Sequence, residues 1–318
     1  MILEKALQSD AETGTTRYTP ESAHALLEII STYSPTSTPK TSVQVTETSN
    51  VPIRLQNTAQ YAPQIVLNSQ KVTVSDDVHC DIILQHTGAG DEAECIDFQI
   101  GKNATVNVIS TQMKDENAMF VGKHTATIGE NSEFNHTVIS LSGKVLRLDL
   151  EAKFAGKNAS IVAKGAYFAK AKEHLEHHIN VLHNMPNCKS DVKYNGVAED
   201  KGTHIVWIAN ALIEPTAFGT NTFVRNKNLV LTKGAIVDSV PNLEILTGDI
   251  QGAGHASSTG RFDDEQLFYL ESRGISETDA KKMIVESFFE EILTGVADKG
   301  IVSSVREYVV KTFEERTK

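Results

Sequence analysis

The sequence predicts a mainly β protein, with a parallel β-helix core followed by a C-terminal α-helical domain. Three observations predict it. A turn rich in Gly, Asn and Asp recurs at nearly constant spacing through the first two thirds of the chain. Each turn is followed by a short strand in which apolar residues alternate with polar ones. Beyond Phe262 the apolar residues recur at helical spacing instead.

The recurring turn is the main support for a solenoid. Measured from Ser75, Gly101, Gly129 and Gly156, the steps are 26, 28 and 27 residues. Such a period is typical of stacked coils, because one coil cannot bury its apolar strand faces alone. Accidental spacing within a β-sandwich is the alternative. The repeated segments are VSDDVHCDII (74–83), IGKNATVNVI (100–109), IGENSEFNHTVI (128–139), AGKNASIVA (155–163) and LTKGAIVD (231–238).

Three regions follow from this pattern. Residues 1–50 contain a short helix candidate, ESAHALLEII (21–30), and a Ser/Thr/Pro-rich stretch (31–50) that indicates an exposed linker. Residues 51–261 form the predicted β-helix core, and residues 262–318 the helical domain. Because a parallel β-helix has open ends, helices at the two termini are expected to cap them, and the sheet edge is expected to support dimerisation.

The stretch from Pro241 to Ile275 joins strand to helix. Asp263 and Asp264 can cap the first helix and Gly274 can end it, and SETD (276–279) begins the next helix, which Gly295 ends. A last helix carries Val302, Val305, Val309 and Phe313 at helical spacing. These helices form either a cap whose apolar stripes pack on each other or a platform that binds a partner.

Composition excludes several functional classes. The chain has 318 residues and a net charge of −11, which disfavours binding to nucleic acid or to an anionic membrane. No apolar run approaches the length of a membrane span, and no secretory signal is evident at the N-terminus. Cys80, Cys95 and Cys188 are odd in number and far apart, so we expect a cytoplasmic protein.

Few residues are candidates for metal binding or catalysis. Four histidines cluster in EHLEHHINVLHN, but alternation along a strand sends neighbours such as His177 and His178 to opposite faces, so no face collects three metal ligands. Cys80 and Cys95 are expected to be buried, and Cys188 to be the most exposed of the three thiols. No P-loop, nucleophile elbow or dinucleotide fingerprint occurs. His255 is the remaining candidate, and the Gly- and Ser-rich segment that carries it is expected to be a loop between the last strand and the first helix.

Several segments carry a resemblance to a known family. Three segments resemble the SufB/SufD family of iron–sulfur cluster assembly scaffolds: HHINVLHNMPNCKSDVKYNGV (177–197), NKNLVLTKGAIVDSVPNLEI (226–245) and GHASSTGRFDDEQLFYLESRGI (254–275). A fourth, SLSG (140–143) followed by Arg147, is also similar. The similarity covers roughly residues 60–295, is most specific from His255 to Ile275, and is greater to SufD-type chains.

The resemblance implies a right-handed parallel β-helix that pairs with a SufB-type paralogue, and C-terminal helices that dock on SufC, an ABC-type ATPase. It implies that His255 is an interfacial ligand or assembly residue for a transient iron–sulfur cluster, and that Leu267, Phe268, Arg273 and Phe288 belong to the ATPase-docking face. No stably bound cofactor is implied, and no motif decides for or against a flavin.

The chain departs from the family pattern at Ala253, where SufD-type chains often have a cysteine, and in its short N-terminal region. The resulting expectation is a non-enzymatic SufD-like scaffold subunit of the SUF system. Two alternatives stay open. A β-helix enzyme acting on polysaccharide would need paired carboxylates and aromatic platforms, which do not stand out. A purely structural β-helix would form a homodimer or larger homo-oligomer without chemistry.

Overall fold

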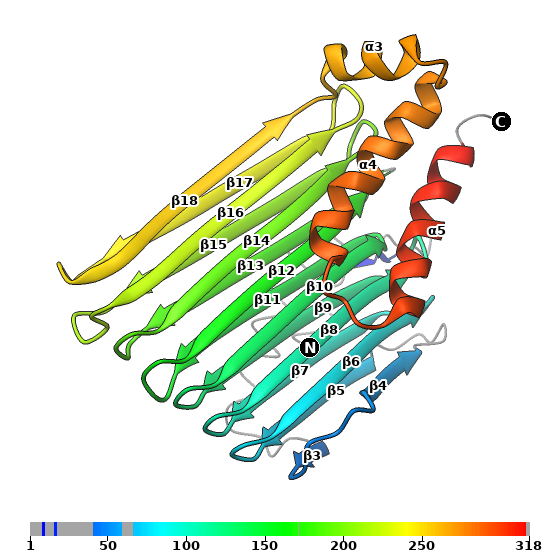
Figure 1. Cartoon of the computed structure of the whole chain (residues 1–318). Helices are drawn as coiled ribbons and strands as arrows, with labels where there is room; N and C mark the ends of the chain where they lie inside the picture. The colour runs from blue at the N-terminus through cyan, green and yellow to red at the C-terminus, as the bar shows by residue number, and fades with distance from the viewer. Residues whose placement is uncertain (1–7, 10–15, 18–40, 59–65, 171, 316–318) are drawn as a thin grey trace.

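The structure is a computed structural model, and it describes residues 8–9, 16–17, 41–58, 66–170 and 172–315. Two parallel sheets face each other and run the length of the solenoid (Figure 1). The chain alternates between the sheets, so each coil contributes one strand to each. The predicted parallel β-helix followed by C-terminal helices is therefore confirmed.

The even-numbered strands from β4 to β18 are neighbours in one sheet, and the odd-numbered strands from β3 to β17 are neighbours in the other. The first sheet consists of β4 (Ile53–Thr58), β6 (His79–Gly88), β8 (Thr105–Lys114), β10 (Glu133–Ser142), β12 (Ser160–Ala169), β14 (Lys189–Ala198), β16 (Thr220–Val230) and β18 (Ile250–Gly260). The second consists of β3 (Thr41–Val45), β5 (Val66–Val74), β7 (Glu92–Ile100), β9 (Met119–Ile128), β11 (Val145–Phe154), β13 (His174–His183), β15 (His204–Ile213) and β17 (Ile236–Ile245).

The sheet register confirms most of the predicted repeat. Thr105, Glu133 and Ser160 are register partners on β8, β10 and β12, at the spacing expected from the turns. The prediction was wrong for LTKGAIVD (231–238). This segment leads from β16 into β17, at the opposite corner of the coil, whereas the other four segments lead from an odd-numbered strand into an even-numbered one.

A ladder of side chains at one corner holds this register. Asn103, Asn131 and Asn158 have φ between 51° and 59°, a left-handed conformation that asparagine tolerates better than most residues. Each amide nitrogen donates to the ladder residue of the coil before it, at 3.0 Å from Asn103 to Asp77, 3.1 Å from Asn131 to Asn103 and 3.1 Å from Asn158 to Asn131. The ladder continues at Asn187, and Gly219 replaces asparagine in the next coil.

The main core lies between the two sheets, in the lumen of the solenoid. Every second residue of a strand faces the lumen, as Ile96, Phe98 and Ile100 do on β7. Val, Ile, Leu and Phe fill most of the lumen nearest the asparagine ladder, and His183, Ser190 and Thr222 are buried there in the later coils. Towards the opposite corner the lumen contains buried polar side chains, among them His86, Glu94 and Asn226. This polar part was not expected from the sequence.

Three helices follow the last strand: α3 (Asp264–Ser272), α4 (Glu277–Leu293) and α5 (Lys299–Glu315). The expectation that C-terminal helices cap the open end was wrong, because α4 and α5 lie across the outer face of the even-numbered sheet (Figure 1). Val285, Phe289 and Ile292 of α4 pack there on a second core that includes outward-facing residues of that sheet. Burial of this apolar stripe determines where the helices lie, so the last coil stays uncovered by described residues.

The N-terminal region bears on two predictions. The helix predicted over 21–30 lies outside the described residues. The first strand of the odd-numbered sheet, β3, lies within the stretch expected to be a linker, and it pairs with β5 from Thr41 to Val45. Two short strands, β1 (Gln8–Ser9) and β2 (Thr16–Arg17), pair antiparallel with each other. No helix of the described residues combines the length and apolar character needed to cross a membrane.

The asparagine ladder yields a stability prediction. Asn131→Ala removes two ladder hydrogen bonds and places alanine at a φ of 58°, so we expect the free energy of unfolding in urea to fall by about 1–3 kcal/mol. Asn131→Gly loses the same bonds but relieves the backbone, and should be the less destabilised variant. Asn117→Ala, at the opposite corner, serves as control. Equal stability of Asn131→Ala and the wild type would contradict the role of the ladder.

Candidate functional site

His255 lies in the middle of β18, the last strand of its sheet. β18 pairs with β16 in parallel, and His255 is the register partner of Val224, a buried residue of the main core. The imidazole therefore belongs to the lumen-facing side of the strand. It is exposed nonetheless, because no further coil follows within the described residues. The strand extends through a segment that the sequence had indicated as a loop.

The composition of β18 follows from its neighbours. Ideal Cβ atoms placed at Gly252 and Gly254 would approach the ring of Phe223, which lies on the outward side of β16, so small residues fit best there. On the lumen side the Oγ of Ser257 lies 2.7 Å from the Oγ of Ser239 on β17. That hydroxyl in turn donates to Asn226 over 2.7 Å. The open end of the lumen is therefore polar beside His255.

No second ligand accompanies His255 within the described part of the chain. Its imidazole makes no hydrogen bond or ion pair there, and the only cluster of three potential metal-ligating side chains found among the described residues does not include it. Ala253, on the same side of β18, offers no ligand atom. A metal ion or cluster at this position would need its other ligands from outside the described chain.

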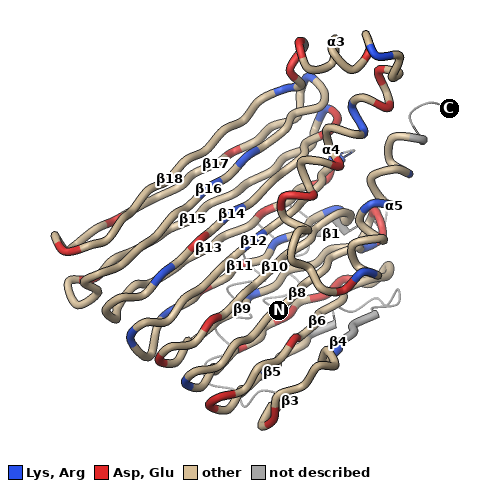
Figure 2. The backbone as a smooth tube through the Cα atoms, viewed as in Figure 1, with Lys and Arg blue, Asp and Glu red and all other residues tan. Residues whose placement is uncertain are grey.

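The edges of the last coil are free to pair. Within the described residues, β17 pairs only with β15, and β18 only with β16. β18 contains no Lys, Arg, Asp or Glu, and its tube is uncharged along its length in Figure 2. Charged side chains are a common defence of an edge strand against pairing with another chain. The same coil exposes Ile236, Val240 and Ile245, of which Ile236 is 54% exposed.

The thiols are not available as ligands on the surface. Cys80 and Cys95 are buried, as expected. The expectation for Cys188 was wrong, because it is also buried and its Sγ lies 3.4 Å from the carbonyl oxygen of Gly156 in the next corner. Burial raises the pKa of the Cys188 thiol, and burial together with the charge of Asp81 raises the pKa of Cys80 to about 11. These two thiols therefore stay protonated near neutral pH.

The histidine cluster on β13 divides as predicted. His177 and His183 face the lumen, whereas His174 and His178 lie on the outer side of the strand. The two outer imidazoles contact opposite oxygens of Glu176, at 3.1 Å from His174 and 2.6 Å from His178. Burial lowers the pKa of His177 to about 3 and that of His183 to about 4, so both lumen rings are neutral.

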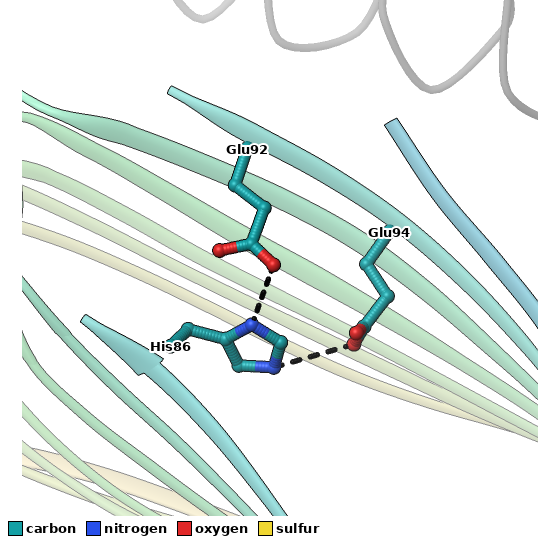
Figure 3. A group of neighbouring side chains, drawn as sticks. All are labelled: His86, Glu92 and Glu94. Carbon is teal, nitrogen blue, oxygen red and sulfur yellow. Dashed lines mark hydrogen bonds and ion pairs between the residues drawn. The ribbon is translucent and has the colours of Figure 1, made fainter. Parts of the chain in front are cut away.

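The lumen contains a group that the sequence analysis missed. His86 of β6 faces Glu92 and Glu94 of β7, with Nδ1 2.9 Å from Glu92 Oε1 and Nε2 3.3 Å from Glu94 Oε1 (Figure 3). All three side chains are at most 1% exposed. The sequence did contain a signal for this group. Its three polar residues occupy lumen-facing positions of β6 and β7, where the alternating pattern otherwise has core residues such as Leu84 and Ile96. We call this group the lumen triad.

Neighbouring charges determine the protonation of the lumen triad. Burial alone lowers the pKa of His86, but the charge of Glu94 and hydrogen bonds to both carboxylates outweigh it and raise the pKa to about 9. Burial raises the pKa of Glu94, yet the charge of His86 and hydrogen bonds from His124 and His86 hold it far below its usual range. Around neutral pH the triad therefore contains an imidazolium ion beside the carboxylate of Glu94.

The residues expected to contact an ATPase are divided between two environments. Phe268 of α3 is 71% exposed and Tyr269 beside it 55%, with the guanidinium of Arg273 5.0 Å above the tyrosine ring. Leu267 is half-buried. Phe288 of α4 is partly buried and packs against the second core. We call Phe268, Tyr269 and Arg273 the α3 patch.

The comparisons with known proteins agree with this architecture. The family model described as "SUF system FeS cluster assembly, SufBD core domain" matches residues 54–288. An iron–sulfur cluster assembly SufBD family protein of Mycobacterium leprae is 38% identical over 269 residues, which is 83% of this chain and 68% of that protein. A Mycobacterium tuberculosis protein of the same description is 41% identical over 239 residues, 73% of this chain and 59% of its own length.

A protein named as SufD also matches. The iron–sulfur cluster assembly protein SufD of Escherichia coli is 33% identical over 174 residues, which is 54% of this chain and 40% of that protein. The chain thus spans between two fifths and about two thirds of the length of these three relatives. The family model alone covers well over half of the chain. The chain therefore belongs to the SufBD family of iron–sulfur cluster assembly proteins.

Proposed function

We propose that this chain is a SufD-like scaffold subunit that helps assemble iron–sulfur clusters at an interface with a SufB-type paralogue. The observation that carries the proposal is His255, an exposed imidazole with no second ligand among the described residues, on a terminal strand that pairs along only one edge there. An imidazole can ligate iron, but it cannot hold a cluster alone. The site becomes complete only if another chain brings thiolates to the last coil.

Strand pairing supplies a physical reason for the partner to bind there. β17 and β18 present rows of unpaired backbone groups, and a second β-helix can satisfy them by continuing both sheets. The exposed Ile236 and Val240 add apolar surface to the same coil. A second copy of this chain is the competing occupant, but it would bring no thiol on β18 to complete the His255 site.

The α3 patch is the proposed contact for a SufC-type ATPase. Phe268 and Tyr269 place two exposed aromatic rings on one short helix, and Arg273 stacks over one of them. Aromatic and arginine side chains are enriched among the residues that dominate binding energy at interfaces. Leu267 is half-buried on the same helix, and Phe288 packs on the second core that holds the helices to the sheet. The scaffold itself is proposed to perform no catalytic step, because nucleotide hydrolysis belongs to the ATPase.

The role of His255 gives the first functional test. We expect His255→Ala to lower the iron and sulfide content of the complex with SufB- and SufC-type partners by about tenfold, a loss in the range seen when support for a metal ligand is removed. The variant should keep the wild-type melting temperature, because the side chain is exposed. Ser258→Ala, three positions further along β18, serves as control. Unchanged cluster content in His255→Ala would contradict the assignment.

The α3 patch gives the second test. Phe268→Asp should weaken binding to the SufC-type ATPase by at least about tenfold, since truncating a central aromatic residue typically costs 2 kcal/mol or more. Binding is measured by titration of the purified chains. Phe218→Asp replaces another exposed phenylalanine, which is 48% exposed at a corner of the solenoid, and should leave ATPase binding unchanged. Equal loss in both variants would show that the patch has no specific role.

A further inference from the structure

The lumen triad consists of side chains that commonly bind transition metals. It combines one imidazole with two carboxylates, from two strands that face each other across the lumen of one coil. One ligand atom from each of His86, Glu92 and Glu94 lies within 4.8 Å of the other two. Ligand atoms bound at about 2.1 Å from a single ion lie at most about 4.2 Å apart. Small side-chain rotations would therefore bring all three onto one ion.

Two buried atoms of the triad have only long polar contacts. The nearest charged partner of His86 Nε2 is Glu94 Oε1 at 3.3 Å, and that of Glu92 Oε2 is Lys114 Nζ at 3.5 Å. Buried polar atoms normally have close partners, and a weakly paired one in a native structure can mark the place of an ion. These two atoms are therefore potential ligand atoms.

A further layer of contacts would orient the ligands. His124 Nε2 lies 3.0 Å from Glu94 Oε1, and His124 Nδ1 lies 2.8 Å from His136 Nε2. Lys114 approaches Glu92 and donates to the carbonyl oxygen of Thr87 over 3.0 Å. Such outer contacts fix the orientation of ligating carboxylates in metal sites and raise their affinity. His124 also provides a second imidazole next to the triad.

We propose that His86, Glu92 and Glu94 bind one divalent first-row transition ion inside the solenoid, with His124 orienting Glu94. The donor set selects the class of ion. Imidazole favours zinc, iron and their neighbours over calcium and magnesium, and the absence of thiolate ligands in the triad disfavours copper(I).

A cavity lies near the triad. It has a volume of about 430 Å³, and Lys114, Ser142, Lys170 and Tyr308 are among the residues that line it. The Nζ of Lys114 lies 3.5 Å from Glu92 Oε2, and the lysine side chain is buried. A buried metal site requires an entry path, and displacement of this lysine side chain would bring the cavity closer to the first ligand.

Titration of the full-length, metal-free chain with Zn²⁺, and with Co²⁺ as a second probe, tests the proposal by calorimetry. We expect one equivalent of each ion to bind, and Glu94→Gln to weaken binding by at least about tenfold. Glu176→Gln is the matched control, because Glu176 lies between two histidines on the outer face of the solenoid. Binding lost in Glu176→Gln but kept in Glu94→Gln would overturn the proposal.

The test does not depend on how well the variants fold. X-ray absorption of the Zn²⁺-loaded wild-type chain should show nitrogen and oxygen ligands only, including at least one imidazole. Absence of saturable binding by the wild type up to about 1 mM metal, an affinity too weak to matter, would overturn the proposal directly. The site is independent of the proposed role of His255, because His255→Ala should bind the probe ions as the wild type does.

Discussion

A coil of a parallel β-helix satisfies its backbone hydrogen bonds only by pairing with another coil, and β17 and β18 have a neighbour on one side. The position of every proposed functional surface depends on this constraint. Stacking places each even-numbered strand beside the next and so builds one continuous sheet. The outer face of that sheet is long enough for α4 and α5 to lie across it. Stacking also leaves a free strand edge at each end of the described solenoid, and His255 lies on the last coil.

The interior of the solenoid is divided along its width. Most residues next to the asparagine ladder are apolar, and buried polar residues gather towards the opposite corner. Burying two carboxylates is costly unless each is paired and hydrogen-bonded, and the lumen triad meets this requirement with His86, His124 and Lys114. Packing alone does not require a carboxylate at Glu92, because Phe120 and Leu146 occupy the equivalent position of the next two coils.

The sequence predicted the fold well, because the signals are local and repeat. Glycine and asparagine at positions such as Gly101 and Asn131 identify the corners, and the change to helical spacing after Phe262 identifies the helices. The spacing between turns is less regular in the later, longer coils, so the turns at Asn187 and Gly219 were not included in the predicted repeat. For the same reason LTKGAIVD was assigned to the wrong corner. Pairing of β3 with β5 in a Thr/Ser-rich stretch depends on a neighbouring strand, which local composition does not reveal.

The candidate site was predicted only in part. The sequence singled out His255, but its place on an open edge and its lack of further ligands depend on the stacking of coils. The lumen triad depends on which residues of β6 face which residues of β7, and Cys188 is buried by a neighbouring corner. Phe288, expected at a docking face, is partly buried against the second core, and its burial depends on residues of the even-numbered sheet. Each of these outcomes depends on contacts distant in sequence.

The most direct test of the account is hydrogen–deuterium exchange of the chain alone and after addition of a SufB-type paralogue. Partner binding should slow exchange in Ile236–Ile245 and Ile250–Gly260, because the unpaired amides of the terminal coil gain partners. Strands in the middle of the solenoid should be unchanged. Unchanged exchange in β17 and β18 when the complex forms, or protection confined to the opposite end of the solenoid, would contradict the account.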